Sequence, residues 1–293
     1  MEVRQSSFEA IGTQWNVQVH TAITDNAWSE LLTQLHARIE IFDTTYSRFR
    51  PDSLITTMWK QAGSYDMPAD AYKMLAFYEQ LYAVTKGSVT PLIGQTMVDA
   101  GYDATYSLQK KALHRSPKWE EILVYDKDGI TLTQPALLDF GAAGKGYLVD
   151  ILAEILEDAE VQTYVINAGS DIRFRSEHND ALEVGLENPL DTSEAVGVAR
   201  LVNASLCASA GSKRQWAGIN HIINPITLKS PENIIASWVI AADTMTADGL
   251  ATALFFTEPD VLLEQFSFSY ALLGSDMSLQ RSPDFPVKIF EAH

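Results

Sequence analysis

The chain has little cysteine and little basic charge, and both absences exclude classes of protein. Its single cysteine, Cys207, rules out an intramolecular disulfide framework and any zinc cluster built on cysteine. We expect Cys207 to be a small buried residue. Only 21 Lys and Arg face 38 Asp and Glu, for a formal net charge of -17. That balance lacks the basic footprint of a nucleic-acid binder and argues against an anionic membrane surface.

Long apolar runs are also missing. No stretch is long enough to cross a bilayer as a helix, and the N-terminus lacks the apolar core of a signal peptide. As written, the sequence predicts a cytoplasmic protein, with a removed export signal or lipoprotein anchor left open. Its 293 residues and 46% hydrophobic content indicate one large domain or two intimately joined ones.

The apolar pattern predicts an α+β fold with mainly antiparallel sheets and helices on their outer faces. Two strands broken at Gly12-Thr13 are expected over residues 3–20, and residues 43–57 are expected to be a loop. Helices are predicted over 26–42, 69–85, 245–256 and 259–265, and from the turn at 141–146 to about 158. Further strands are predicted at 122–125, 130–133, 137–140, 164–167, 182–187, 196–202, 204–208, 220–224, 234–241 and 268–273.

Asp248 and Thr252 form the most informative pair. On a helix they would share one face, one turn apart. A carboxylate and a hydroxyl so placed, among small neighbours, make half of an oxygen-rich site for a hard cation such as Mg²⁺. The alternative is a helix acid beside a Thr that bonds back to its own helix.

The glycine-rich turn at 141–146 contains Lys145 and precedes a predicted helix. Backbone amides at a helix start can hold an anion, and Lys145 adds a point charge there. The spacing fits neither the GxxxxGK[ST] phosphate loop nor the dinucleotide GxGxxG pattern. A tight strand-to-helix turn without a ligand remains the alternative.

Two further segments are candidates. The turn at Asn167–Asp171 follows a strand, and its small residues would let a ligand pass close to the backbone. His221 opens the apolar stretch that ends at Pro225 and has a side chain suited to acid–base chemistry near neutral pH. For each, a structural role remains the alternative, as a plain turn and as a satisfied histidine.

Taken together and in order, these segments resemble one family. The blocks are Gly12-Thr13, Tyr46–Ser53, Leu138–Asp150, Val165–Ile172, Asn220–Thr227 and Ala247–Thr252. They look like the ApbE family of FAD:protein FMN transferases, over nearly the whole chain. The DxGxxxKGxxxD block and the later ADxxxT block carry most of the specificity.

The resemblance implies a single catalytic domain over 1–293, with two T-fold-like halves and FAD bound between them. It implies Mg²⁺-dependent (or Mn²⁺-dependent) transfer of FMN from FAD to a Thr or Ser of a target flavoprotein, releasing AMP. Two alternatives stay open. One is an FAD pyrophosphatase that uses water as the acceptor, and the other is a non-catalytic flavin-binding protein.

Residue roles follow from the same resemblance. The metal ligands would be the Asp248 and Thr252 side chains and the Gly144 carbonyl. Catalytic roles fall on His221, Lys145 and Asp248. The flavin-binding positions are Ser47, Asp139, Gly141, Lys145, Gly169, Ser170, Gly211 and His221, and Ser53 matches a second serine near the ligand.

Several positions depart from the family pattern. Ser170 replaces a second glycine, Ala210 a serine, Lys213 an aromatic residue, Asn224 an aspartate and Leu228 a glycine. Thr90 stands for an aspartate before Pro91, and Gly144 stands where Ala is usual. None of these changes removes a predicted metal ligand, Lys145 or His221. They leave open the choice between transfer to a protein and hydrolysis of FAD.

Overall fold

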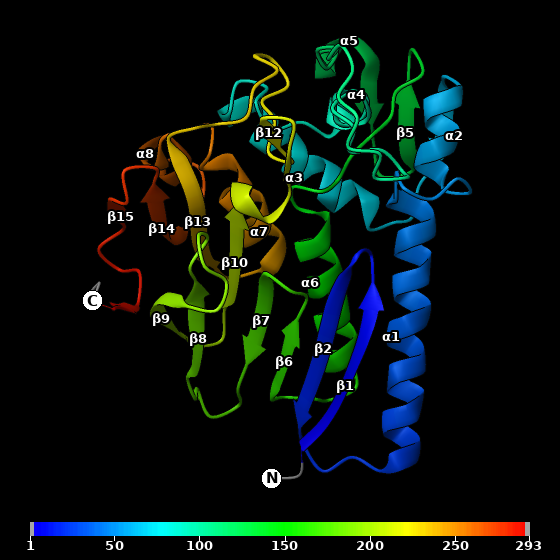
Figure 1. Ribbon diagram of the computed structural model, residues 1–293. Coiled ribbons are helices and arrows are strands. Elements are labelled where there is room, and N and C mark those ends of the chain that lie inside the picture. The colour runs from blue at the N-terminus through cyan, green and yellow to red at the C-terminus, as the bar shows by residue number, and fades with distance from the viewer. Residues whose placement is uncertain (1–2, 291–293) are drawn as a thin grey trace.

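The computed structural model describes residues 3–290 (Figure 1), so both ends of the expected 1–293 domain lie outside the described residues. An eight-stranded sheet forms its centre, and every strand pairing in it is antiparallel. Its strands, in spatial order, are β1 (Val3–Ala10), β2 (Thr13–His20), β6 (Tyr164–Asn167), β7 (Asp171–Arg175), β10 (Ser205–Ala210), β13 (Ile234–Ala241), β14 (Phe268–Gly274) and β15 (Leu279–Arg281).

Helices cover one face of this sheet. α6 (Gly144–Asp158) and α7 (Thr244–Ala253) contact its central strands, and the long α1 (Asp25–Tyr46) lies against α6 beside the β1–β2 hairpin (Figure 1). A three-stranded sheet covers part of the opposite face, in the order β16 (Val287–Ile289), β9 (Ala195–Leu201) and β8 (Leu182–Glu187). The predicted α+β class with antiparallel sheets and flanking helices is therefore confirmed.

The alternation of side chains along the strands explains these layers. In β13, Val239 and Ala241 belong to the core under the helices, whereas Ala236 and Trp238 belong to the core under the three-stranded sheet. Because successive strand residues point to opposite faces, an apolar residue at nearly every position of β13 requires cover on both sides.

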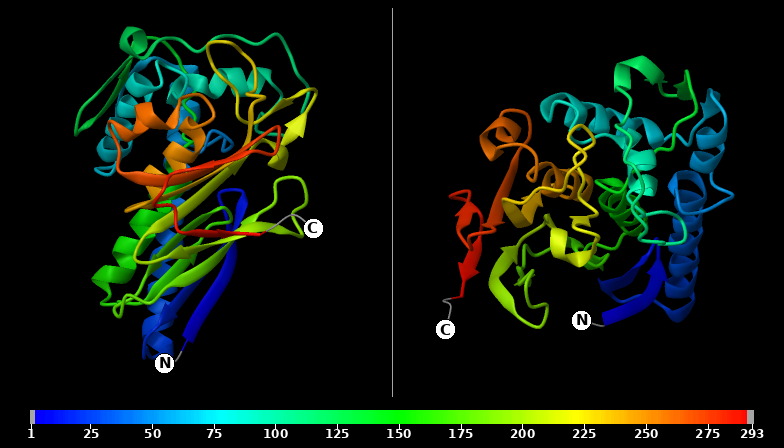
Figure 2. Two further views of the ribbon diagram at one scale, coloured as in Figure 1. Left: turned by 90° about the vertical axis from the view of Figure 1, so that its left-hand side faces the viewer. Right: turned by 45° about the horizontal axis from the view of Figure 1, so that its top comes forward.

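The remaining elements form a second region above the sheet, as the side view shows (Figure 2). Its helices are α2 (Leu54–Lys60), α3 (Ala71–Val84), α4 (Gly94–Asp99), α5 (Trp119–Ile122) and α8 (Pro259–Leu263), with short 3₁₀ turns at Pro91–Ile93 and Gly211–Lys213. Its strands are β3 (Gly63–Asp66), β4 (Leu123–Tyr125), β5 (Gly129–Leu132), β11 (Gln215–Trp216) and β12 (Ile219–Asn220). The division into two T-fold-like halves stays a prediction.

The expected loop at 43–57 is wrong at both ends. α1 continues to Tyr46, and α2 begins at Leu54. Ser53 is the N-cap of α2, and its hydroxyl accepts a hydrogen bond from the Thr56 amide at 3.1 Å. Asp52 and Ser53 before this helix, and Thr56 and Thr57 within it, hid the seven-residue α2, although Ile55 and Met58 are buried.

Two predicted strands are also wrong. Residues 137–140 belong to no strand, although all but the half-buried Asp139 are buried, and the Asp139 amide instead donates to the Pro91 carbonyl at 2.7 Å. Of the predicted strand 220–224, only Asn220 lies in a strand, the two-residue β12. Burial alone produced both apolar patterns, which periodicity cannot distinguish from a paired strand. No helix within residues 3–290 has the length and apolarity to cross a membrane.

Candidate functional site

The contact between α6 and α7 brings the predicted metal pair to the glycine-rich turn. Asp248 is only 5% exposed, and its Oδ2 accepts a hydrogen bond from the Gly146 amide at 2.9 Å. Its Oδ1 receives no hydrogen bond from any residue in the described range 3–290. Asp248 therefore lies beside the turn and keeps one oxygen for another ligand.

Gly146 makes this close approach of the helices possible. A Cβ at position 146 would lie 2.3 Å from the Thr244 carbonyl oxygen and 2.7 Å from Asp248 Cβ. Both distances are far below van der Waals contact, so only glycine fits between the helices.

We expect Gly146→Ala to destabilise the protein by about 2–4 kcal/mol, because α7 must move away from α6. Gly144→Ala is the matched control on the same helical turn. There the nearest atom to a new Cβ is Phe140 Cβ at 3.1 Å, and the gain in helix propensity offsets a small shift. Urea unfolding measures both changes, and equal losses for the two variants would contradict this packing argument.

Thr252 and Gly144 complete the predicted ligand set. Thr252 is half-buried on α7, one turn beyond Asp248, and its hydroxyl makes no hydrogen bond with the described part of the chain. Gly144 opens α6. A carboxylate oxygen and a hydroxyl one turn apart on α7, both without a donor in the described part of the chain, suit a hard cation that keeps several waters, as Mg²⁺ does. Residues 3–290 hold no group of three or more His, Cys, Asp or Glu arranged for a metal.

The electrostatics of Asp248 fit a cation as well. Burial raises the pKa of this carboxyl above its ordinary value, while Lys145 and the hydrogen bond from Gly146 act in the opposite direction. A carboxylate buried at this cost gains most from a nearby positive charge.

Lys145 is held by a partner that the sequence reasoning missed. Its Nζ forms an ion pair with Asp171 Oδ2, and Ser170 Oγ lies 3.4 Å away. The Asp171 side chain is fully buried. Asp171 is the last residue of the Asn167–Asp171 turn. A charged residue in a turn that follows a strand was the sequence signal that could have pointed to this partner of Lys145. The lysine charge is thus fixed in place and largely balanced within the protein.

The turn offers fewer free amides than its sequence suggests. Four of its N–H groups donate within the protein, those of Gly141, Ala143, Gly144 and Gly146. Their acceptors are Asp139 Oδ1, Tyr78 Oη, the Phe140 carbonyl and Asp248 Oδ2, at 2.7, 3.0, 2.7 and 2.9 Å. Anion binding by these amides stays a prediction, and the structure leaves fewer N–H groups to support it.

Asp139 is engaged through both carboxylate oxygens. Oδ1 caps the Gly141 amide, and Oδ2 forms an ion pair with Arg48. The Arg48 side chain is 2% exposed, and its guanidinium lies over the rings of Phe49 and Tyr102, at 4.0 and 4.9 Å from their centroids. Its Nη2 is buried and has no hydrogen-bond partner within residues 3–290. Sequence reasoning missed Arg48, although it directly follows the candidate Ser47.

His221 lies close to this cluster. Burial, with a smaller contribution from the nearby Arg214, lowers the pKa of its imidazole to about 4, although Asp139 acts in the opposite direction. The ring is therefore neutral at pH 7. Its Nδ1 is buried without a hydrogen-bond partner among the described residues. A buried nitrogen that no protein group satisfies is typical of an atom reserved for a ligand.

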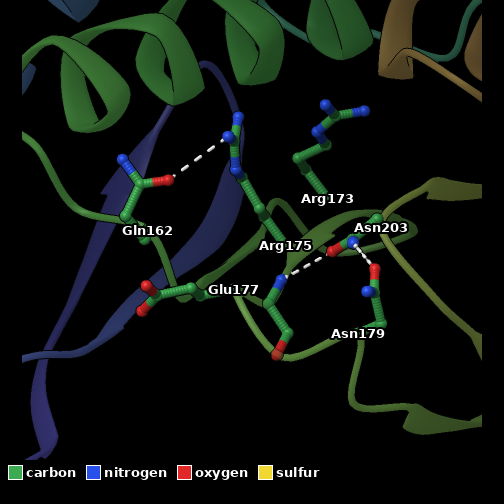
Figure 3. Close-up of a pocket in the computed structure, with 7 residues that line it drawn as sticks. Gln162, Arg173, Arg175, Glu177, Asn179 and Asn203 are labelled. Carbon is green, nitrogen blue, oxygen red and sulfur yellow. Dashed lines mark hydrogen bonds between the residues drawn. The ribbon is translucent and has the colours of Figure 1, made fainter.

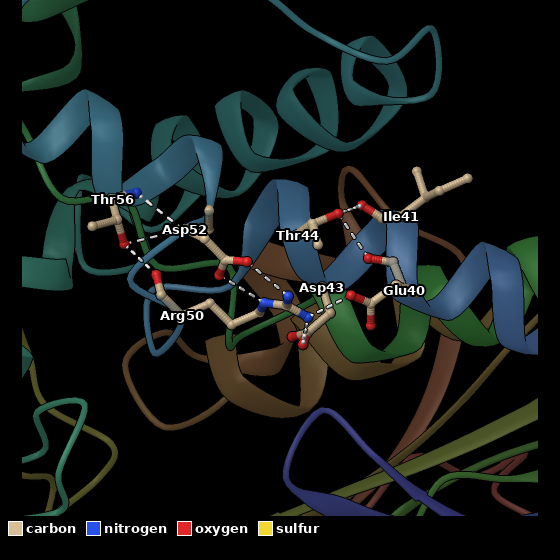
Figure 4. Close-up of polar contacts among 8 residues, drawn as sticks. Glu40, Ile41, Asp43, Thr44, Arg50, Asp52 and Thr56 are labelled. Carbon is tan, nitrogen blue, oxygen red and sulfur yellow. Dashed lines mark hydrogen bonds and ion pairs between the residues drawn. The ribbon is translucent and has the colours of Figure 1, made fainter.

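The segment that carries Ser47 and Ser53 is held by Arg50 (Figure 4). Its guanidinium contacts Asp52 at 2.9 Å, Glu40 at 2.8 Å and Asp43 at 3.2 Å, which ties the segment to the end of α1. Ser53 is fully buried as the cap of α2, so its hydroxyl has a structural role. Ser47 is half-buried just after α1 and remains a candidate for flavin binding.

The other predicted flavin positions lie at backbone turns. Gly169 has a φ of +75°, and a Cβ there would lie 2.7 Å from Thr13 Oγ1, so this turn packs against the tip of the β1–β2 hairpin. Gly211 starts a 3₁₀ turn, where a Cβ would meet the side-chain Nδ2 of Asn220 at 2.5 Å. The backbone conformation at Gly169 and the close contact at Gly211 favour glycine, which is compatible with flavin binding but does not test it.

The structure explains several departures from the family pattern. Asn224 organises its turn: Oδ1 accepts from the Ile226 and Thr227 amides at 2.9 and 3.0 Å, and Nδ2 donates to Ser88 at 3.3 Å. Lys213 forms an ion pair with Glu187 of β8. The Ser170 hydroxyl lies 3.3 Å from Asp171 Oδ1, beside the Lys145 pair. Ala210 ends β10 opposite Ala236, and nothing in the structure explains the loss of its hydroxyl.

Leu228 retains the backbone of a glycine. Its φ is +61°, in the left-handed region that costs a branched residue about 1–2 kcal/mol. We expect Leu228→Gly to relieve this strain and to stabilise the protein by about 1 kcal/mol. The gain is smaller than the strain because glycine loses more conformational entropy on folding. Thr227→Gly, at a residue without positive φ, is the control and should destabilise slightly. Thermal unfolding compares them, and a lower Tm for Leu228→Gly would refute the strain.

Two hollows in the described chain are lined by other residues. One, of about 790 Å³, lies between the tip of the β1–β2 hairpin and α1. The other, of about 370 Å³, is lined by polar side chains that include Arg173 and Arg175 (Figure 3). No predicted site residue lines either hollow. The candidate site is therefore described by the α6–α7 contact.

Known proteins share this architecture. The ApbE protein of Thermotoga maritima superposes with a TM-score of 0.81 at 18% identity, covering 96% of this chain and 97% of that one. The flavin transferase ApbE of Vibrio cholerae gives a TM-score of 0.78 at 19% identity, with 96% of each chain covered. At this identity the likeness establishes the fold, which is that of the flavin transferases.

Sequence comparison goes further, because residues 11–269 match the ApbE family. This chain belongs to that family. The FAD:protein FMN transferase of Haemophilus influenzae is 27% identical over 288 residues, 88% of this chain and 82% of the relative. The protein of the same name from Salmonella typhimurium is 23% identical over 267 residues, 84% of this chain and 76% of the relative.

Proposed function

We propose that this protein is an FAD:protein FMN transferase, which moves FMN from FAD to a Thr or Ser hydroxyl of a target flavoprotein and releases AMP. Family membership and the shared name of its relatives support the transferase. The free oxygen of buried Asp248, beside the glycine-rich turn, supports a divalent cation at this site. We propose Mg²⁺, or Mn²⁺ in its place.

The chain's own residues suit this reaction. Asp248, Thr252 and the Gly144 carbonyl would hold the cation, which when bound would neutralise charge on the diphosphate. Lys145, fixed by Asp171, keeps a positive charge close to Asp248. Neutral His221 can accept the proton of the incoming hydroxyl as that oxygen bonds to the FMN phosphorus and AMP departs.

The test uses FAD and Mg²⁺ with and without a Thr-containing peptide from a flavoprotein. A transferase should attach flavin covalently to the peptide and release one AMP for each flavin attached. Equal AMP release in both mixtures, with no flavin on the peptide, would favour the pyrophosphatase. No AMP under any condition would leave the non-catalytic flavin-binding protein. The acceptor protein and the cytoplasmic location stay predictions.

A further inference from the structure

α6 and α7 are joined by two reciprocal sets of hydrogen bonds. The Gly146 amide of α6 donates to the Asp248 carboxylate of α7 at 2.9 Å. One turn further along α6, Asp150 accepts in the opposite direction, from the Thr244 amide to Oδ1 and from the Met245 amide to Oδ2, each at 2.8 Å. Thus each helix provides one carboxylate that accepts hydrogen bonds from backbone amides of the other helix.

Asp150 is costly to place there. It is 7% exposed, and burial raises the pKa of its carboxyl to about 6, with Asp243 acting in the same direction and the two amide donors opposing. Two charge-assisted hydrogen bonds and the positive end of the α7 dipole offset that cost.

Asp243 caps the same helix in a different way. It is the N-cap of α7, and its Oδ1 accepts from the Thr246 amide at 2.8 Å, entirely within its own helix. Asp243 therefore stabilises the end of α7, whereas Asp150 also fixes where that end lies on α6. The second effect bears on the cation site, because its ligands are divided between the two helices.

We propose that Asp150 is a positioning residue for the cation site. Asp150 holds the first turn of α7 on α6. It thereby sets the distance from the two ligands on α7, Asp248 and Thr252, to the ligand on α6, the Gly144 carbonyl. The inference rests on the proposed function, since it requires a cation at those ligands. It gives Asp150, the last residue of the DxGxxxKGxxxD block, a role in cation affinity without contact with the cation.

The test is the affinity of the folded protein for Mn²⁺, measured by electron paramagnetic resonance. Asp150→Asn keeps the size of the side chain but replaces one acceptor with a donor that faces an amide. We expect its Mn²⁺ affinity to fall by about tenfold or more. Asp243→Asn, the same change on the same helix end, should leave Mn²⁺ affinity within about twofold of the unaltered protein, because the α6–α7 contact is kept.

The outcomes separate the inference from the proposed function. If the unaltered protein binds no Mn²⁺, the proposed cation site fails and the inference fails with it. If the unaltered protein binds Mn²⁺ and Asp150→Asn binds it equally well, only the inference is overturned. Equal losses of Mn²⁺ affinity in both variants would also overturn the inference, because weakening the end of α7 would then be sufficient to explain the loss.

A measurement on the unaltered protein covers the case in which Asp150→Asn does not fold. Coupling between two sites is reciprocal, so a cation at Asp248 must strengthen the Asp150 contacts as much as those contacts strengthen cation binding. Hydrogen exchange of the peptide containing Thr244 and Met245 should therefore slow on addition of Mn²⁺. Unchanged exchange at saturating Mn²⁺ would overturn the inference.

Discussion

Asp248→Ala should abolish Mg²⁺-dependent release of AMP from FAD, with a loss of at least about a thousandfold. The expected size follows from the site, because Asp248 is the only carboxylate in the predicted ligand set. Asp248→Asn should lose a similar factor, since an amide is a far weaker ligand for a hard cation. The assay follows AMP by chromatography at saturating FAD over a range of Mg²⁺ concentrations.

Stability measurements separate this loss from unfolding. Burial raises the pKa of Asp248, so its charge is a cost to the folded state, and Asn can still accept the Gly146 hydrogen bond. Asp248→Asn should therefore unfold at the same temperature as the unaltered protein or higher. Asp243→Asn on the same helix should keep its rate within a few-fold. A rate for Asp248→Ala above one tenth of normal would remove Asp248 from the mechanism.

His221→Ala should lower the rate by about 10² to 10⁴, the range typical of a lost acid–base group. With a pKa of about 4, His221 is neutral from about pH 5 upward. The rate of the unaltered protein should therefore not change with His221 ionisation above pH 5, and it should fall as the pH drops through 4. In His221→Ala that acidic limb should disappear. Rates measured from below pH 4 up to pH 8 test both effects.

The pH dependence of stability gives an independent check on the lowered pKa of His221. Its folded pKa lies below the ordinary value of 6.5, so the unfolded chain takes up a proton first as the solution is acidified. The contribution of neutral His221 to stability is complete above pH 6.5 and is lost as the pH falls from 6.5 through 4. The stability difference between the unaltered protein and His221→Ala should shrink over that range. A rate loss below tenfold would return His221 to a structural role.

The fold class was predictable because it depends on local signals. The break at Gly12-Thr13 and the apolar faces of α1, α3, α6 and α7 follow from the spacing of side chains along a single element. The failures have the same origin. α2 was missed because a polar cap begins it, and residues 137–140 looked like a strand because burial gives an unpaired chain the same apolar pattern.

The candidate site was predictable to the same extent, because its residue types are local features and its side-chain partners are not. Residue order alone was enough to identify the types of residue that could carry the chemistry: a carboxylate and a hydroxyl one helical turn apart, a glycine-rich turn with Lys145, and His221. Their partners could be found only in the folded chain: Asp171 for Lys145, Arg48 for Asp139 and the first turn of α7 for Asp150. Residue spacing describes neighbours along one element, whereas these pairs join elements whose approach depends on packing across the whole core.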